Sequence, residues 1–186
     1  MATYSQRMTI DRSTAARILD STPVKGLLVG LAASQALDWV SIAIYESEDR
    51  KTWLSENLAR RGRHAYEVGV AQLAGLAGKR LSRRAEKKWG WKLHQAFGLL
   101  SGIQYVALRR RYPRLGAGMG LLFGAAFFLA ADELLMPLLR WTPGPRAFSW
   151  KVHARGAASH LAYGLAAEAT ARLLDRAAAS TAAAVH

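Results

Sequence analysis

The stretch LGAGMGLLFGAAFFLAADELLMPLL, residues 115–139, decides the fold class of this chain. It is 25 residues long, contains no Lys, Arg or His, and carries two adjacent acids, Asp132 and Glu133. A helix of this length reaches roughly 37 Å, which is enough to cross the hydrocarbon core of a bilayer with some tilt. We therefore interpret residues 115–139 as a transmembrane helix.

A second apolar run, residues 26–45, is interrupted by a single charge at Asp38. A signal peptide cleaved after Ala36 is one interpretation of this run. The apolar sequence continues nine residues past Ala36, however, which is longer than a cleaved signal needs. We take the run as a retained span, with Trp39 and Tyr45 toward its far end.

The charge of the chain supports the same class of protein. The 186 residues carry a net charge of +13, from 26 Lys and Arg against 13 Asp and Glu. The basic residues lie in the segments between apolar runs, as in the loops that flank membrane spans, so we prefer this explanation to nucleic-acid binding. The chain has no cysteine, which excludes disulfides, thiolate metal sites and a cysteine nucleophile.

Three shorter helices complete the predicted fold: residues 65–78, 93–108 and 156–174. Residues 79–92 carry seven bases and end in Trp89 and Trp91, a pattern typical of an interfacial anchor on anionic lipid headgroups. We predict an all-α integral membrane bundle of four to five helices. Its domains are a polar N-terminal segment (1–23), a helical membrane domain (24–176) and a disordered alanine-rich tail (177–186).

The Lys and Arg counts of the loops do not fix the orientation. With five spans they favour an inside N-terminus, by 15 to 11. With four spans, omitting 65–78, they favour an outside N-terminus, by 16 to 10. We give a slight preference to five crossings.

Glycines recur on the predicted helices at spacings that allow close packing. The candidate packing residues are Gly26, Gly30, Gly98, Gly102, Gly120, Gly124 and Gly164. Gly26-x3-Gly30 followed by Asp38 matches Gly120-x3-Gly124 followed by Asp132, at a constant offset of 94 residues. This match indicates an internal duplication, in which residues 65–81 would correspond to 159–175.

Polar residues inside the apolar runs form the candidate functional cluster, because a charge within a membrane helix is costly unless it is paired or hydrated. The cluster comprises Asp38, Glu67, His94, Asp132, Glu133, His153, His160 and Glu168. His94-x2-Phe97-Gly98 and His160-x2-Tyr163-Gly164 repeat one local pattern. Two His with several carboxylates suit a divalent metal, so His94, His160, Glu67 and Glu133 are the candidate ligands. No Walker A, G-x-G-x-x-G, H-E-x-x-H or G-x-S-x-G motif is present.

Taken together, these glycines and polar residues, with Tyr105 and Pro137, resemble the YagU-like bacterial inner membrane proteins over roughly residues 24–175. That family is a domain of unknown function. The resemblance implies a polytopic helical protein of the bacterial cytoplasmic membrane and implies no reaction.

Three functional hypotheses remain open. The first is a membrane protein of unassigned role whose His and acidic residues form a proton- or ion-linked network, with no cofactor. The second is a metal-dependent membrane enzyme that uses the same residues. The third is an accessory or scaffold subunit that forms a homo-oligomer or joins a larger membrane complex through its glycine-rich faces.

Overall fold

The computed structural model describes residues 12–183, and all regular secondary structure in this range is helical. The long elements are α2 (Thr22–Ser47), α5 (Arg83–Arg111) and α8 (Trp150–Ala183). The short helices are α1 (Arg12–Asp20), α3 (Arg50–Ala59) and α4 (Ala65–Leu76). Between α5 and α8 the chain forms η1 (Pro113–Gly120), α6 (Leu121–Phe128), the π-helix η2 (Leu129–Leu135), α7 (Met136–Leu138) and η3 (Pro145–Ala147).

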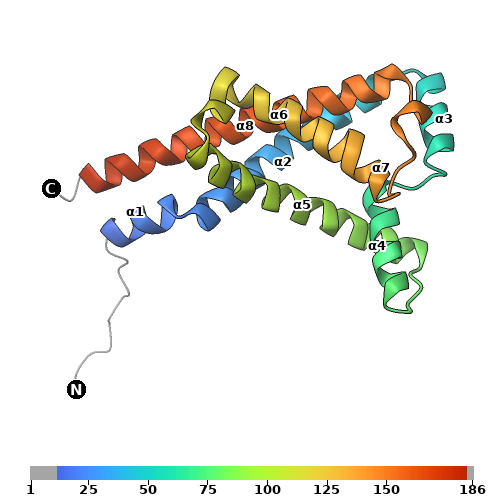
Figure 1. Cartoon of the computed structure of the whole chain (residues 1–186), viewed down its shortest axis with the longest axis horizontal. Helices are drawn as coiled ribbons and strands as arrows, with labels where there is room; N and C mark the ends of the chain where they lie inside the picture. The colour runs from blue at the N-terminus through green and yellow to red at the C-terminus, as the bar shows by residue number, and fades with distance from the viewer. Residues whose placement is uncertain (1–11, 184–186) are drawn as a thin grey trace.

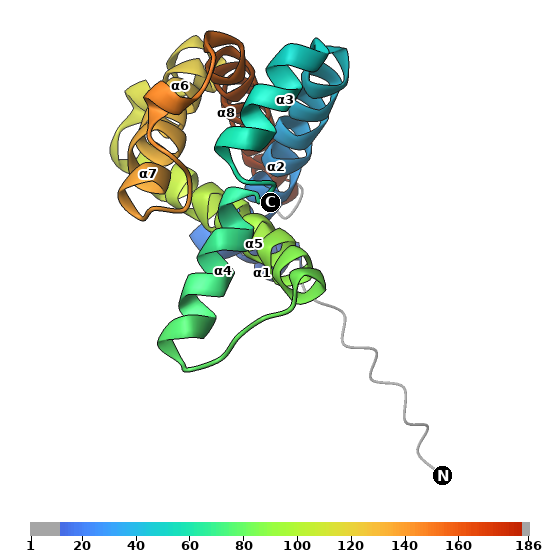
Figure 2. The ribbon, with the colours of Figure 1, turned by 90° about the vertical axis from the view of Figure 1, so that its right-hand side faces the viewer.

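Four elements run along the length of the molecule: α2, α5, the continuous α6–η2–α7 segment, and α8 (Figure 1). We call the end that holds α1 and the last turns of α8 the α1 end, and the end that holds α3, α4 and α7 the α4 end. Helix α2 packs along both α5 and α8, while α6 packs on α8. Figure 2 looks at the α4 end, where α3, α4 and α7 lie around the ends of the long helices.

The predicted helix over 115–139 is interrupted in the structure, which corrects that expectation at its N-terminal part. Ala117 is extended, and Gly118, Met119 and Gly120 have φ of 60°, 58° and 86°. Glycine adopts this left-handed backbone without a steric penalty, so residues 113–120 form a compact turn instead of helix. The continuous helical part comprises α6, η2 and α7, which together hold 18 residues.

Other boundaries also differ from the predictions. Ser82 caps α5 by accepting a hydrogen bond from the Ala85 N–H, so most of the basic segment 79–92 is helical. The charged segment 46–63 contains α3, which Asp49 caps in the same way. Helix α8 continues to Ala183 through residues expected to be disordered, consistent with the high helix propensity of alanine. Residues 1–11 of the predicted N-terminal segment and 184–186 of the tail lie outside the described residues.

Helix α4 bears on the predicted number of crossings. At 12 residues it packs against α5 at the α4 end and does not run along the bundle (Figure 1). Four elements therefore follow the long axis and α4 is not a fifth, while the number of membrane crossings stays a prediction.

The predicted packing glycines lie where helices touch. A Cβ atom added to Gly26, Gly30 or Gly102 would lie within 3.0 Å of backbone atoms across the α2–α5 contact. The same holds for Gly120, Gly124 and Gly164 across the contact of η1 and α6 with α8. A Cβ on Gly98 would collide with the Ser34 hydroxyl. These contacts bring the helix backbones close together and fix the positions of the polar residues one or two turns away.

Large apolar side chains are exposed on the long helices, and several charged side chains are buried. Exposed residues include Leu31 (51%), Ile42 (53%) and Leu129 (59%), whereas Lys25 (2%) and Glu168 (1%) are buried. Two segments, Thr22–Ser47 and Pro113–Leu138, are long and apolar enough to cross a membrane. Only 22% of each apolar window is buried, whereas the core helix of a soluble protein would be mostly covered.

Candidate functional site

A cavity of about 750 Å³ lies toward the α4 end of the bundle, among α2, α4, α5, the α6–η2–α7 segment and α8. Seven of the eight polar residues singled out from the sequence line it: Asp38, Glu67, His94, Asp132, Glu133, His153 and His160. The eighth, Glu168, is near the α1 end. Seven of the eight residues grouped from the sequence therefore line one cavity, and Glu168 does not.

The histidines and acids of the cavity form three pairs. His94 Nε2 lies 3.1 Å from Asp38 Oδ1, and His153 Nδ1 lies 2.6 Å from Glu133 Oε1. In the third pair, His160 Nδ1 is 3.8 Å from Asp132 Oδ2, which is too long for a hydrogen bond, and it faces the Gly156 carbonyl at 2.9 Å. Each pair joins residues from different helices, so each depends on the packing of the bundle.

The His153 pair carries a specific proton requirement. Its Nε2 lies 3.0 Å from the Pro145 carbonyl, while its Nδ1 faces the Glu133 carboxylate. Both neighbours offer oxygen acceptors, and a neutral imidazole has only one N–H. Both contacts are satisfied only when His153 is an imidazolium or when Glu133 is protonated and donates.

The π-helix η2 positions the two adjacent acids. Successive residues of an α-helix point about 100° apart, which would turn one of two neighbouring side chains away from a common site. Asp132 and Glu133 both lie on η2 and both line the cavity, where they face His160 and His153 of α8. Short π segments within α-helices are frequent at functional sites.

Aromatic rings connect the walls of the cavity. The Tyr66 ring lies 4.9 Å from the His94 ring, and Phe127 lies 4.9 Å from His160. Phe97 and Phe127 stack between these two sides at 6.0 Å. Burial raises the pKa of the Tyr66 phenol above its ordinary 10, and the negative charges of Asp132 and Asp38 raise it further. Both aspartates therefore act on the same part of the cavity.

The two aspartate–histidine pairs occupy equivalent positions in two helix pairs. On α2 and on the α6–η2 segment, Asp38 and Asp132 each follow a packing glycine by eight residues, and on α5 and α8, His94 and His160 each precede one by four. Helix α2 packs on α5, and α6 packs on α8. The structural counterpart of α8 is thus α5, and not the segment 65–81 that the sequence match suggested. The offset of 94 residues holds for the first helix of each pair, whereas the matching residues of α5 and α8 are 66 apart, so the internal duplication stays a prediction.

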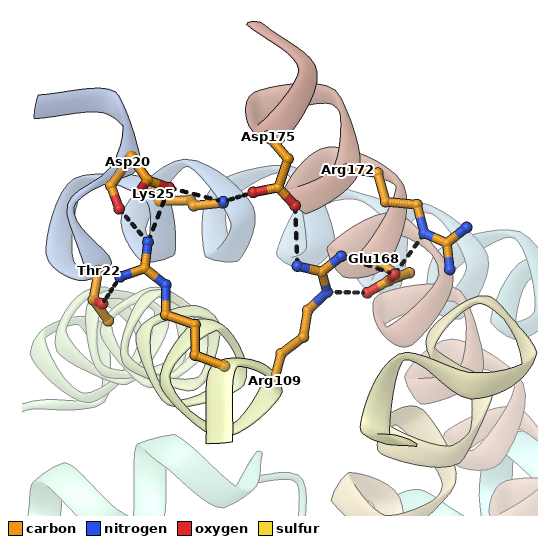
Figure 3. A network of polar contacts seen from close by, with 8 residues as sticks. Asp20, Thr22, Lys25, Arg109, Glu168, Arg172 and Asp175 are labelled. Atoms are coloured by element: carbon orange, nitrogen blue, oxygen red, sulfur yellow. Dashed lines mark hydrogen bonds and ion pairs between the residues drawn. The ribbon is translucent and has the colours of Figure 1, made fainter. Parts of the chain in front are cut away.

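Glu168 belongs to an ion-pair network at the α1 end (Figure 3). Its carboxylate accepts hydrogen bonds from the Tyr105 hydroxyl, from Arg109 Nε at 2.7 Å and from Arg172 Nε at 2.5 Å. Arg109 also contacts Asp175 at 3.0 Å, and Asp175 pairs with the buried Lys25. Arg110 extends the network to Asp20 at 3.0 Å and to Thr22 at 2.8 Å. The network joins α1, α2, α5 and α8 through permanent charges.

A second ion-pair network, the Glu56 network, lies beside the cavity and was not predicted from the sequence. Arg155 of α8 binds Glu48 at 2.6 Å and Glu56 of α3 at 2.7 Å, and Glu56 also binds Arg60 at 2.8 Å. Burial alone would raise the pKa of Glu56, but the hydrogen bond from Arg155 and the charges of both arginines hold that pKa below its usual value. No sequence signal indicated that α3, within a charged segment, would pack on α8.

The four candidate metal ligands are distributed over separate contacts. His94 pairs with Asp38, His160 lies near Asp132, and Glu133 pairs with His153. Glu67 lies 3.2 Å from Arg83. Among residues 12–183, no group of three or more His, Asp or Glu side chains is arranged to hold a metal ion. The metal hypothesis stays a prediction.

Comparison with known proteins gives a family and no reaction. The model of a family described as protein of unknown function (DUF1440) matches residues 64–169, which is more than half of the chain. The matched range contains all the cavity histidines and acids named above except Asp38. No curated protein and no solved structure matches the chain.

Proposed function

We propose that this chain, which belongs to the DUF1440 family of proteins of unknown function, is an integral membrane protein with four crossings that binds and transfers protons through its cavity. One observation carries the proposal: three histidine–carboxylate pairs, drawn from α2, α5, η2 and α8, line a single cavity of about 750 Å³. Imidazole and carboxylate groups that face water in such a cavity are the components of proton relays in membranes.

The distribution of polarity supports the membrane setting. Leucines and isoleucines cover the outside of the bundle, and charged groups such as Lys25, Glu56 and Glu168 are buried and paired. In water, so extensive an apolar surface would drive association, whereas in lipid it is the favourable exterior. The resemblance to the YagU-like proteins supports the bacterial cytoplasmic membrane as the location.

We further propose that the α4 end faces the cytoplasm. With four crossings α1 and the last turns of α8 lie on the same side, and 16 of the 26 Lys and Arg residues lie in residues 50–92 and 140–155 toward the α4 end. All six tryptophans lie in helix halves or turns toward that end, and Trp89 and Trp91 are 51% and 64% exposed. Aromatic residues beside Lys and Arg suit the headgroup region of an anionic leaflet.

The absence of cysteine allows a direct test of this orientation. In intact cells a membrane-impermeant maleimide should label Ser180→Cys, near the end of α8, and should label Ala77→Cys, after α4, only once the cells are opened. The reverse labelling pattern would contradict this orientation. Recovery of the labelled protein in the soluble fraction after the cells are opened would contradict the membrane location.

Proton transfer is tested with purified protein in liposomes that contain a pH-sensitive dye. A potassium diffusion potential should drive proton uptake faster than in protein-free liposomes. Asp132→Asn and Glu133→Gln should reduce this uptake while leaving the melting temperature of the protein nearly unchanged. Glu46→Gln, an exposed acid outside the cavity, is the matched control and should behave like the native protein. Uptake equal to that of empty liposomes would overturn the proposal.

A further inference from the structure

We propose that the cavity binds a bulky organic cation, of the quaternary ammonium or phosphonium class, in exchange for protons. This inference rests on the proposed function and adds to it the chemical class of the transported or sensed ligand. It depends on the charges that face the cavity, the aromatic rings between them, the size of the cavity and one buried hydroxyl without a partner.

The charged groups of the cavity leave three carboxylates without a permanent positive partner. The acids that line it are Asp38, Glu67, Asp132 and Glu133, and the bases are Arg60, Lys87 and Arg155. Arg155 and Arg60 are bound to Glu56, Glu67 lies beside Arg83, and Lys87 is exposed. Among the described residues, Asp38, Asp132 and Glu133 form ion pairs only with histidines, whose charge depends on pH. Asp38 and Asp132 are the two that make no contact shorter than 3.0 Å with their histidine.

The space between these aspartates suits an organic cation better than a bare metal ion. The volume of about 750 Å³ lies in the range of pockets for drug-sized ligands. The aromatic rings of Tyr66, Phe97 and Phe127 line the cavity, where Tyr66 contacts His94 and Phe127 contacts His160. Aromatic faces attract weakly hydrated cations, and quaternary ammonium groups are recognised in this way.

Ser34 supplies an independent sign that the cavity accommodates a ligand. The residue is 4% exposed and lines the cavity, yet its hydroxyl has no hydrogen-bond partner in the described part of the chain. The hydroxyl lies beside Gly98 of α5, and a buried hydroxyl without a partner costs free energy unless water or a bound molecule supplies one. A bound molecule, with the water that accompanies it, would provide one.

Exchange follows from the histidines. His64, His94, His153 and His160 all line the cavity, from the start of α4 and from α5 and α8. When His94 and His160 are protonated, their charges neutralise Asp38 and Asp132 and repel a second cation. When a cation binds beside these carboxylates, the imidazoles release their extra protons to water, so each positive charge that enters replaces one that leaves.

The test uses the full-length protein in detergent and tetraphenylphosphonium as the probe, with binding measured by calorimetry. Tetraphenylborate, an anion of the same shape, is the matched control for apolar partitioning. The phosphonium should bind at pH 8, bind at least about tenfold more weakly at pH 6, and release protons into a weakly buffered solution. Loss of one adjacent charge in Asp38→Asn or Asp132→Asn should also weaken binding at least about tenfold, and Glu46→Gln should not.

Equal binding of the phosphonium and the borate, or unchanged binding in both aspartate variants, would overturn the inference. If one variant fails to fold, the pH dependence and the comparison of the two ions still decide the matter with the native protein. Proton uptake by liposomes without phosphonium binding would refute the cation site and leave the proposed function standing. Phosphonium binding without proton uptake or release would instead refute the proton function.

Discussion

The two ends of the bundle use carboxylates in opposite ways. At the α1 end, Glu168 and Asp175 bind arginine and lysine, whose charges persist at all physiological pH values. In the cavity toward the α4 end, Asp38, Glu133 and Asp132 face histidines. A permanent pair fixes helices in place, whereas a histidine pair gains or loses charge near neutral pH.

This contrast separates structural acids from candidate functional acids within one chain. Glu168 is 1% exposed and receives hydrogen bonds from three side chains, which leaves it little capacity for another ligand. The side chains of Asp38 and Asp132 are 27% and 43% exposed at the cavity and retain access to water. Substitutions at the two ends should therefore separate effects on stability from effects on function.

The largest loss of stability is expected from Glu168→Gln. It leaves the guanidinium groups of Arg109 and Arg172 with no carboxylate at this site, and breaking a buried pair typically costs about 3–5 kcal/mol. The measurement is the midpoint of denaturant or thermal unfolding in detergent. Lys151→Met, which removes an exposed ion pair with Asp49, is the control and should change the midpoint little. An unfolding midpoint of Glu168→Gln equal to that of the native protein would show that the network at the α1 end does not stabilise the bundle.

A smaller loss is expected when a glycine contact is widened. In Gly124→Ala, the new methyl group would meet the His160 carbonyl and the Leu161 backbone, so the helices must separate, at a cost of about 1–3 kcal/mol. The same substitution at Gly75, where an added Cβ meets no atom within 4 Å, is the matched control. Equal unfolding midpoints for the two variants would contradict the close α6–α8 contact.

The Glu56 network should make the stability of the protein sensitive to acid. Because the pKa of Glu56 is held below its ordinary value of 4.5, its contribution to stability is full above that value and is lost as pH falls through the lowered pKa. We expect the melting temperature to fall as pH decreases below about 4.5. Glu56→Gln should start from a lower melting temperature and show a flatter acid limb, and an unchanged limb would assign the acid sensitivity to other carboxylates.

The smallest effect on stability is expected from Asp132→Asn. Asp132 is partly exposed and makes no hydrogen bond to His160, so the change in unfolding free energy should be within about 0.5 kcal/mol. Proton uptake by the same variant should nevertheless be reduced. A large loss of stability would show that Asp132 is a structural acid like Glu168, and it would contradict the proposed difference between the two ends.

The sequence predicted the features that arise from local patterns. Hydropathy located α2 and the α6–α7 segment, and glycine spacing identified the residues at the helix contacts. The histidine and acid positions could be proposed because charges are conspicuous within apolar runs. What the sequence did not reveal depends on three-dimensional packing: that Glu168 would turn toward Arg109, and that Arg155 would draw α3 onto α8. The break at Gly118 and Gly120 also escaped detection, because glycine is compatible with both a tight turn and a packed helix.

The direction in which Asp132 and Glu133 point depends on the length of the π segment Leu129–Leu135. Removing one residue from this segment would leave the hydropathy of the chain almost untouched, and it would still favour insertion into lipid. The regular helix that resulted would nevertheless change the direction of both acids relative to the histidines of α8. Two relatives could thus share every apolar run and every acid, and differ in activity through the length of a single turn.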